Sequence, residues 1–149
     1  MTDYWTISMT GRPASPSLSS ARRLVIKIGS ALVVDPERAA PRQAWLASVA
    51  EDIAQLRRQG TDVTVVSSGA IALARHTLGL THGALRLPEK QAAAAVGQIS
   101  LAQAWSQALS TQGLTAAQLL LTPDDTEDRK RYLTPAPRLI RCWGWAACR

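Results

Sequence analysis

The sequence predicts an α/β fold in which a mainly parallel sheet carries helices on both faces. Two short β-branched apolar runs, at 24–28 and 63–67, each end in Gly and Ser and are each followed by helical periodicity. Strand and helix patterns that alternate in this way are typical of βαβ units with parallel strands. The 149 residues suffice to bury one core.

The first expected strand is Leu24–Ile28, with a turn at Gly29 and Ser30. Its apolar run is nearly continuous rather than alternating, which is typical of a strand buried on both faces. Lys27 interrupts this run, and burying an unpaired ammonium is costly. Lys27 either faces solvent, along its stem or from an edge strand, or reaches the carboxyl end of the strand, where open α/β sheets bind ligands.

Four helices and two further strands are expected after this turn. A helix from about Arg42 to Gln59 has Pro41 at its start, Gly60 at its stop and an apolar stripe at Trp45, Leu46, Val49, Ile53 and Leu56. The second strand, Val63–Ser67, leads directly into a helix at Gly69–Leu78. An Ala-rich helix at Glu89–Thr111 follows, with an expected buried line of Val96, Ile99, Trp105 and Leu109. Gly113 ends it, Leu119–Thr122 reads as a third strand, and another helix begins in 124–131.

The two ends of the chain differ from this pattern. Residues 1–21 are rich in Ser, Thr and Pro and read as a disordered leader. Residues 134–149 begin with Thr-Pro-Ala-Pro, which cannot continue a helix, and then place two Trp, two Cys and three Arg at neither helical nor strand spacing. This tail is either a basic aromatic segment that binds RNA or membrane, or the product of a lost reading frame. We favour the lost frame, because the tail replaces a helix that has already begun.

The charge distribution argues against a nucleic-acid partner. The formal net charge is +6, but residues 24–128 contain 8 basic and 10 acidic residues, so the positive charge lies at the ends. A nucleic-acid-binding domain concentrates basic residues on its folded elements. No run approaches the roughly 18 apolar residues of a membrane span, and no signal-peptide pattern is present. We expect a cytoplasmic protein with reduced cysteines and no membrane partner.

The chemistry of the chain centres on the two strand ends. The two histidines lack metal partners at useful spacing, and the acidic run 124–128 suits a helix start, so no metal site is expected. Gly/Ser turns that lead into helices present backbone N–H groups to anions. Lys27 would add a positive charge beside one turn, a combination that suits phosphoryl transfer. The residues alone therefore predict an α/β domain that handles anions or phosphates.

Several segments resemble one family. Residues 24–30 (LVIKIGS) resemble the first strand of the amino acid kinase superfamily. More narrowly, the chain resembles the glutamate 5-kinase family of proline biosynthesis at 66–71 (VSSGAI), 90–98 (KQAAAAVGQ), 118–122 (QLLLT) and 127–133 (EDRKRYL). The resemblance covers about residues 22–133, which we interpret as a partial amino acid kinase domain.

The resemblance implies a reaction and two groups of site residues. The γ-carboxylate of L-glutamate would attack the γ-phosphate of ATP, with Mg²⁺ on the nucleotide, to give glutamyl 5-phosphate. Lys27 would be catalytic, stabilising the transferring group. The residues implied for ATP phosphates are Lys27, Gly29 and Ser30, and those implied for glutamate are Ser68, Gly69 and Ala70. A homo-oligomer is expected for the full-length family.

The resemblance stops at Leu133. Beyond it, the family completes the glutamate site and adds the nucleotide-base and ribose site, which this sequence does not match. We therefore expect a truncated or frame-shifted kinase that is inactive alone. The alternative is a non-catalytic remnant or binding module that associates with a full-length kinase.

Overall fold

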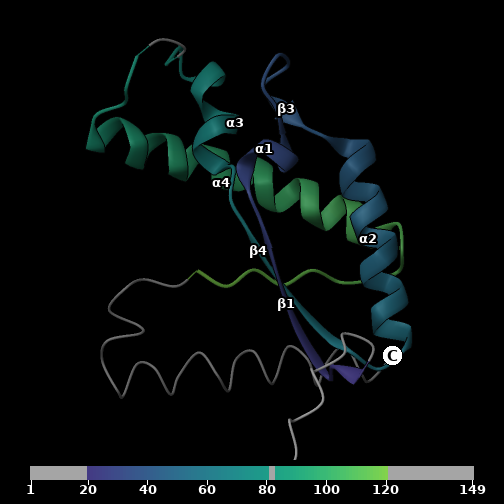
Figure 1. Cartoon of the computed structure of the whole chain (residues 1–149). Helices are drawn as coiled ribbons and strands as arrows, with labels where there is room; N and C mark the ends of the chain where they lie inside the picture. Colours follow the sequence, from purple (N-terminus) through teal and green to yellow (C-terminus); the bar gives the residue numbers. More distant parts are fainter. Residues whose placement is uncertain (1–19, 81–82, 121–149) are drawn as a thin grey trace, which may run out of the picture.

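The computed structural model describes residues 20–80 and 83–120 (Figure 1). Its elements, in chain order, are β1 (Arg23–Ile28), α1 (Ser30–Val33), β2 (Val34–Asp35), β3 (Ala40–Pro41), α2 (Gln43–Arg58), β4 (Asp62–Ser67), α3 (Ala70–Thr77) and α4 (Leu87–Ser110). The predicted α/β class with a parallel sheet is confirmed. Residues 1–19 of the expected leader, the helix expected in 124–131 and the tail 134–149 lie outside the described residues. The expected third strand lies half outside them, and Leu119 and Leu120 belong to no strand.

β1 and β4 pair in parallel, so both strands end at the same edge of the sheet. Their register runs from Arg23 opposite Asp62 to Ile28 opposite Ser67. The Ser68 N–H then donates to the Ile28 carbonyl at 3.0 Å, which extends the pairing by one residue. The turns that follow the two strands are therefore neighbours.

The burial of β1 alternates along the strand, which differs from the expected burial on both faces. Ile26 and Ile28 join Val63 and Val65 of β4 in the core with α2 and α4. Val25 is 67% exposed on the other face of the pair, where Lys27 is also exposed. The sequence predicted burial on both faces because Val25, which faces outward, is as apolar as the residues that face the core.

The helices α2 and α3 agree with the sequence to within one residue at each end. Gly60, at φ +85°, follows α2, and Gly69, at φ +131°, precedes α3. Both glycines adopt backbone conformations that other residues rarely take, so their positions in the sequence predict these helix boundaries. In Figure 1, α3 rests on the first half of α4, and α2 packs beside its second half.

The buried face of α4 differs from the expected one. Val96 and Ile99, expected in the core, are 39% and 71% exposed. Trp105 is buried as expected, and the other buried positions are Ala93, Gly97, Leu101, Ala104 and Ala108. Small side chains let α4 approach its neighbours closely, so the larger β-branched residues lie outside.

The hairpin β2–β3 was not predicted. Val33 and Val34 are buried, and Arg42 joins them to α2 through its N–H on the Val33 carbonyl (2.8 Å) and its Nε on the Val34 carbonyl (3.2 Å). Asp35 Oδ1 accepts the N–H groups of Glu37 and Arg38 at 3.0 and 3.3 Å. These hydrogen bonds lower the pKa of Asp35 below its usual range. Asp35-Pro36 is turn chemistry that could have indicated the hairpin.

A hydrogen bond connects α4 to the end of β4. Trp105 is buried, and its indole Nε1–H donates to Ser67 Oγ at 3.0 Å. The two residues are 38 positions apart in the sequence. A buried indole N–H needs an acceptor, so this bond fixes where α4 meets the strand end.

Replacing Ser67 by Ala should destabilise the fold, because the buried Trp105 N–H would lose its acceptor. We expect a loss of about 1–3 kcal/mol in the free energy of unfolding, measured by urea denaturation. Ser48→Ala on the exposed surface of α2 is the matched control and should leave stability unchanged. Equal stability of the Ser67 and Ser48 variants would contradict the assigned role of the bond.

Candidate functional site

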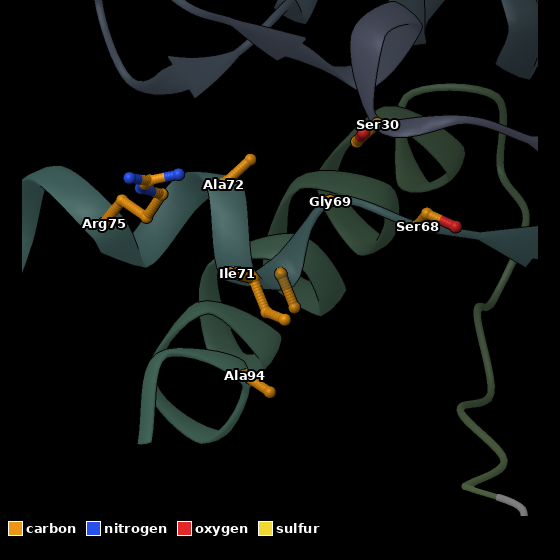
Figure 2. A pocket seen from close by; sticks show the side chains of 8 residues that line it. Ser30, Ser68, Gly69, Ile71, Ala72, Arg75 and Ala94 are labelled. Carbon is orange, nitrogen blue, oxygen red and sulfur yellow. The ribbon is translucent and has the colours of Figure 1, made fainter. Parts of the chain in front are cut away.

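An open hollow of about 470 Å³ lies where β1 and β4 end. It is lined by eight residues from α1, the β4–α3 turn, α3 and α4, namely Ser30, Ser68, Gly69, Ala70, Ile71, Ala72, Arg75 and Ala94. Figure 2 shows these side chains grouped around the turn at Gly69. The position matches the edge at which open α/β sheets bind ligands.

Four of the six residues implied by the family resemblance line this hollow. They are Ser30 from the first turn and Ser68, Gly69 and Ala70 from the second. The parallel register explains the meeting, because it ends both strands at one level. Their roles in binding stay predictions.

The other two residues, Lys27 and Gly29, lie beside the hollow without lining it. Lys27 is exposed on the open face of the sheet, in register with Val66, and its ammonium makes no hydrogen bond or ion pair with residues 20–80 or 83–120. It is the penultimate residue of β1, so its flexible stem starts near the strand end. Gly29 is the N-cap residue of α1. The Lys27 side chain is thus exposed to solvent and also lies near the carboxyl end of β1, beside the hollow.

Gly69 allows the two strand-end turns to touch. A Cβ at this position would lie 3.1 Å from Val34 Cγ2 and 3.8 Å from the Ser30 Cα. Its φ of +131° is also one that side chains rarely tolerate. Conformation is thus the main reason for glycine here, and a larger residue would also press on the Val34 methyl.

Gly97 of α4 supports the same turn from the opposite side. A Cβ built on Gly97 would lie 1.7 Å from the Ala70 carbonyl oxygen, far inside van der Waals contact. The backbone of α4 therefore touches the start of α3 directly. Gly97 belongs to the 90–98 segment on which the family resemblance partly rests.

The start of α3 offers free hydrogen-bond donors. The Leu73 N–H donates to the Gly69 carbonyl at 3.0 Å, and the amides before it have no intrahelical acceptor. No side chain caps this helix start, and the Ser68 hydroxyl beside it is exposed. Such donors suit a negatively charged group. Across the described residues, no cluster of three or more His, Cys, Asp or Glu could hold a metal ion.

Sequence reasoning missed Arg75. It lies in the last turn of α3, where a basic residue interacts favourably with the helix dipole. That structural role explains an arginine at this position, so no sequence pattern assigned it to a site. Its guanidinium donates to the carbonyls of Leu80 and Gly83, each at 2.9 Å. The apolar lining residues Ile71, Ala72 and Ala94 carried no chemical signal in the sequence.

Comparison with known proteins identifies similar sequences. The model of the amino acid kinase family matches residues 22–143. The chain is 64% identical over 125 residues to a glutamate 5-kinase of Gluconobacter oxydans, covering 84% of this chain and 33% of the relative. It is 52% identical over 134 residues to that of Bradyrhizobium diazoefficiens (90% and 36%) and 59% identical over 131 residues to that of a Ruegeria species (88% and 36%). The chain spans about a third of the length of these curated relatives.

Gly97→Ala should destabilise the fold and move the turn. In an ordinary helix interior this change stabilises by about 1 kcal/mol, whereas here the added methyl meets the Ala70 carbonyl, and overpacking costs about 1–3 kcal/mol. We expect a lower unfolding free energy by denaturation and shifted amide resonances at 70–73. Ser100→Ala, exposed on the same helix, is the control. A Gly97 variant more stable than wild type would show that α4 does not press on the turn.

Proposed function

The chain belongs to the amino acid kinase family, and we propose that it forms the acceptor- and phosphate-binding part of a glutamate 5-kinase. The proposed reaction transfers the γ-phosphate of ATP to the γ-carboxylate of L-glutamate and yields glutamyl 5-phosphate and ADP. The observation that carries the proposal is the meeting of the Gly29-Ser30 and Ser68-Gly69-Ala70 turns at one hollow. The names of relatives up to 64% identical support it.

The residues around the hollow have separate proposed roles. Ser68 and the free amides at the start of α3 would hold and orient the acceptor glutamate. Ser30 and the Gly29 backbone would face the phosphates of ATP. The Lys27 ammonium would swing from the open face toward the transferring phosphoryl group, where charge neutralisation lowers the barrier.

The transfer itself is a displacement at phosphorus. A γ-carboxylate oxygen of glutamate forms a bond to the γ-phosphorus, and the bond from that phosphorus to the bridging oxygen of ADP breaks. The electron pair leaves with ADP, whose growing negative charge also needs a cation nearby. The protein's contribution in this scheme is to align the carboxylate with the leaving oxygen and to supply Lys27.

The proposal assigns no metal ligand among the described residues, because no acidic cluster is present there. Mg²⁺ would arrive as the counterion of the nucleotide. A place in proline biosynthesis, a cytoplasmic location and a homo-oligomeric full-length protein belong to the proposal through the family resemblance alone. Among the described residues, no helix has the length and apolarity that a membrane crossing requires.

A chimera tests the proposed function. Residues 22–133 would replace the matching segment of the Gluconobacter oxydans relative, and glutamate-dependent ADP release would be measured. We expect activity that falls at least about a hundredfold in kcat with Lys27→Ala, the usual loss when an oriented transition-state group is removed. The 149-residue chain assayed alone should release no ADP in response to glutamate.

Arg23→Ala is the control for charge, because Arg23 lies at the other end of the same face of β1. It should leave the kcat of the chimera unchanged. An inactive chimera would favour the alternative of a non-catalytic binding module. An active chimera that tolerates Lys27→Ala would show that the catalytic role is misassigned.

A further inference from the structure

Arg75 is the one charged residue among the eight that line the hollow. It lies six positions after Gly69 on α3, and the other seven lining residues are Ser, Gly, Ala and Ile. Figure 2 shows the Arg75 and Ala72 side chains on the same side of α3. An anionic ligand in the hollow would meet the Ser68–Ala70 donors at one end and the Arg75 guanidinium at the other.

The guanidinium is held in place without losing its charge. Nε donates to the Leu80 carbonyl and Nη2 to the Gly83 carbonyl, each at 2.9 Å, while the Leu80 N–H returns to the Arg75 carbonyl at 2.8 Å. Carbonyl acceptors orient the fork but do not neutralise it. Within residues 20–80 and 83–120, no carboxylate forms an ion pair with Arg75. Guanidinium has five N–H donors, and no acceptor within the described residues bonds Nη1.

The Arg75 guanidinium is therefore oriented before a ligand binds and can form an ion pair with an anionic group. An arginine side chain usually loses conformational entropy when it binds a ligand. Here the hydrogen bonds to Leu80 and Gly83 already restrict the side chain before binding, so this loss is smaller. Three of the other lining side chains, Ile71, Ala72 and Ala94, are apolar and suit methylene groups. The site therefore fits a short ligand with an acidic group at each end and an apolar middle.

We propose that Arg75 binds the carboxylate of the substrate that is not phosphorylated, the α-carboxylate of glutamate. This inference rests on the proposed function, which places the reacting γ-carboxylate at the Ser68–Ala70 turn. Along the axis of α3, Gly69 and Arg75 are separated by about 9 Å, at 1.5 Å per residue, and the ligand and the long Arg75 side chain together span that length. Arg75 would then select substrates that carry a second carboxylate.

The test compares L-glutamate with 4-aminobutyrate, which keeps the reacting carboxylate but lacks the α-carboxylate. The ¹⁵N-labelled 149-residue chain is titrated with each ligand, and the amide resonances of residues 68–72 report dissociation constants down to weak binding. We expect wild type to prefer glutamate at least tenfold, the contribution of one charged hydrogen bond. Arg75→Gln should abolish this preference and leave the affinity for 4-aminobutyrate unchanged.

Two further variants separate charge from structure. Arg75→Lys keeps the positive charge but cannot donate to both carbonyls, so it should retain a reduced preference for glutamate. Arg58→Gln removes an exposed arginine from the last turn of α2, away from the hollow, and should behave as wild type. The dispersion of the amide spectrum shows whether Arg75→Gln folds. If it does not fold, the titration of Arg75→Lys tests the inference, which requires a reduced but measurable preference for glutamate.

The outcomes distinguish the inference from the function on which it rests. Equal weakening of both ligands in Arg75→Gln would show that Arg75 only holds the Leu80 and Gly83 carbonyls, and would overturn the inference. An unchanged preference in that variant, or a complete loss of preference in Arg75→Lys, would also overturn it. Wild type that shifts with neither ligand would contradict glutamate binding by this chain, and the assignment of Arg75 would fall with it.

Discussion

The fold around the hollow depends on one close approach, that of the α4 backbone to the start of α3. With no side chain at Gly97, the helix can lie against the Ala70 carbonyl, where a Cβ would be 1.7 Å away. This contact sets the distance between the two helices, and so it sets where the β4–α3 turn can lie. Because that turn carries three of the residues implied for glutamate, the geometry of the site follows from a position on another helix.

Four consecutive residues show how tightly the turn is specified. Ser67 accepts the Trp105 indole N–H, Ser68 lines the hollow, Gly69 packs against Val34, and Ala70 touches Gly97. Ser67 and Ala70 contact α4 and Gly69 contacts β2, so the turn is held by α4 on one side and by the β2–β3 hairpin on the other. Such support from several elements is what a site needs to keep donors oriented before a ligand arrives.

The parts that were predictable from sequence are those that glycine, proline and strand patterns define. Gly60 marked the C-terminal end of α2 and Gly69 the start of α3, because other residues rarely adopt their backbone conformations. The gathering of Ser30 with Ser68–Ala70 followed from two parallel strands ending together. The buried face of α4 was not predictable from hydrophobicity, since Gly97 and three of the alanines (Ala93, Ala104 and Ala108) are buried while the more apolar Ile99 is exposed. Arg75 was missed because its importance comes from the loop carbonyls it reaches, which sequence spacing does not reveal.

Native-state hydrogen exchange tests most directly whether α4 holds the turn. The informative amides are Ser68, bonded to the Ile28 carbonyl, and Leu73, bonded to the Gly69 carbonyl. If the turn is locked onto α4, these amides should exchange only when the core does, with the same opening free energy as Leu101 and Trp105 in the buried part of α4. Exchange of Ser68 and Leu73 at a much lower free energy than the α4 core would contradict this account, because the turn would then open while α4 stayed in place.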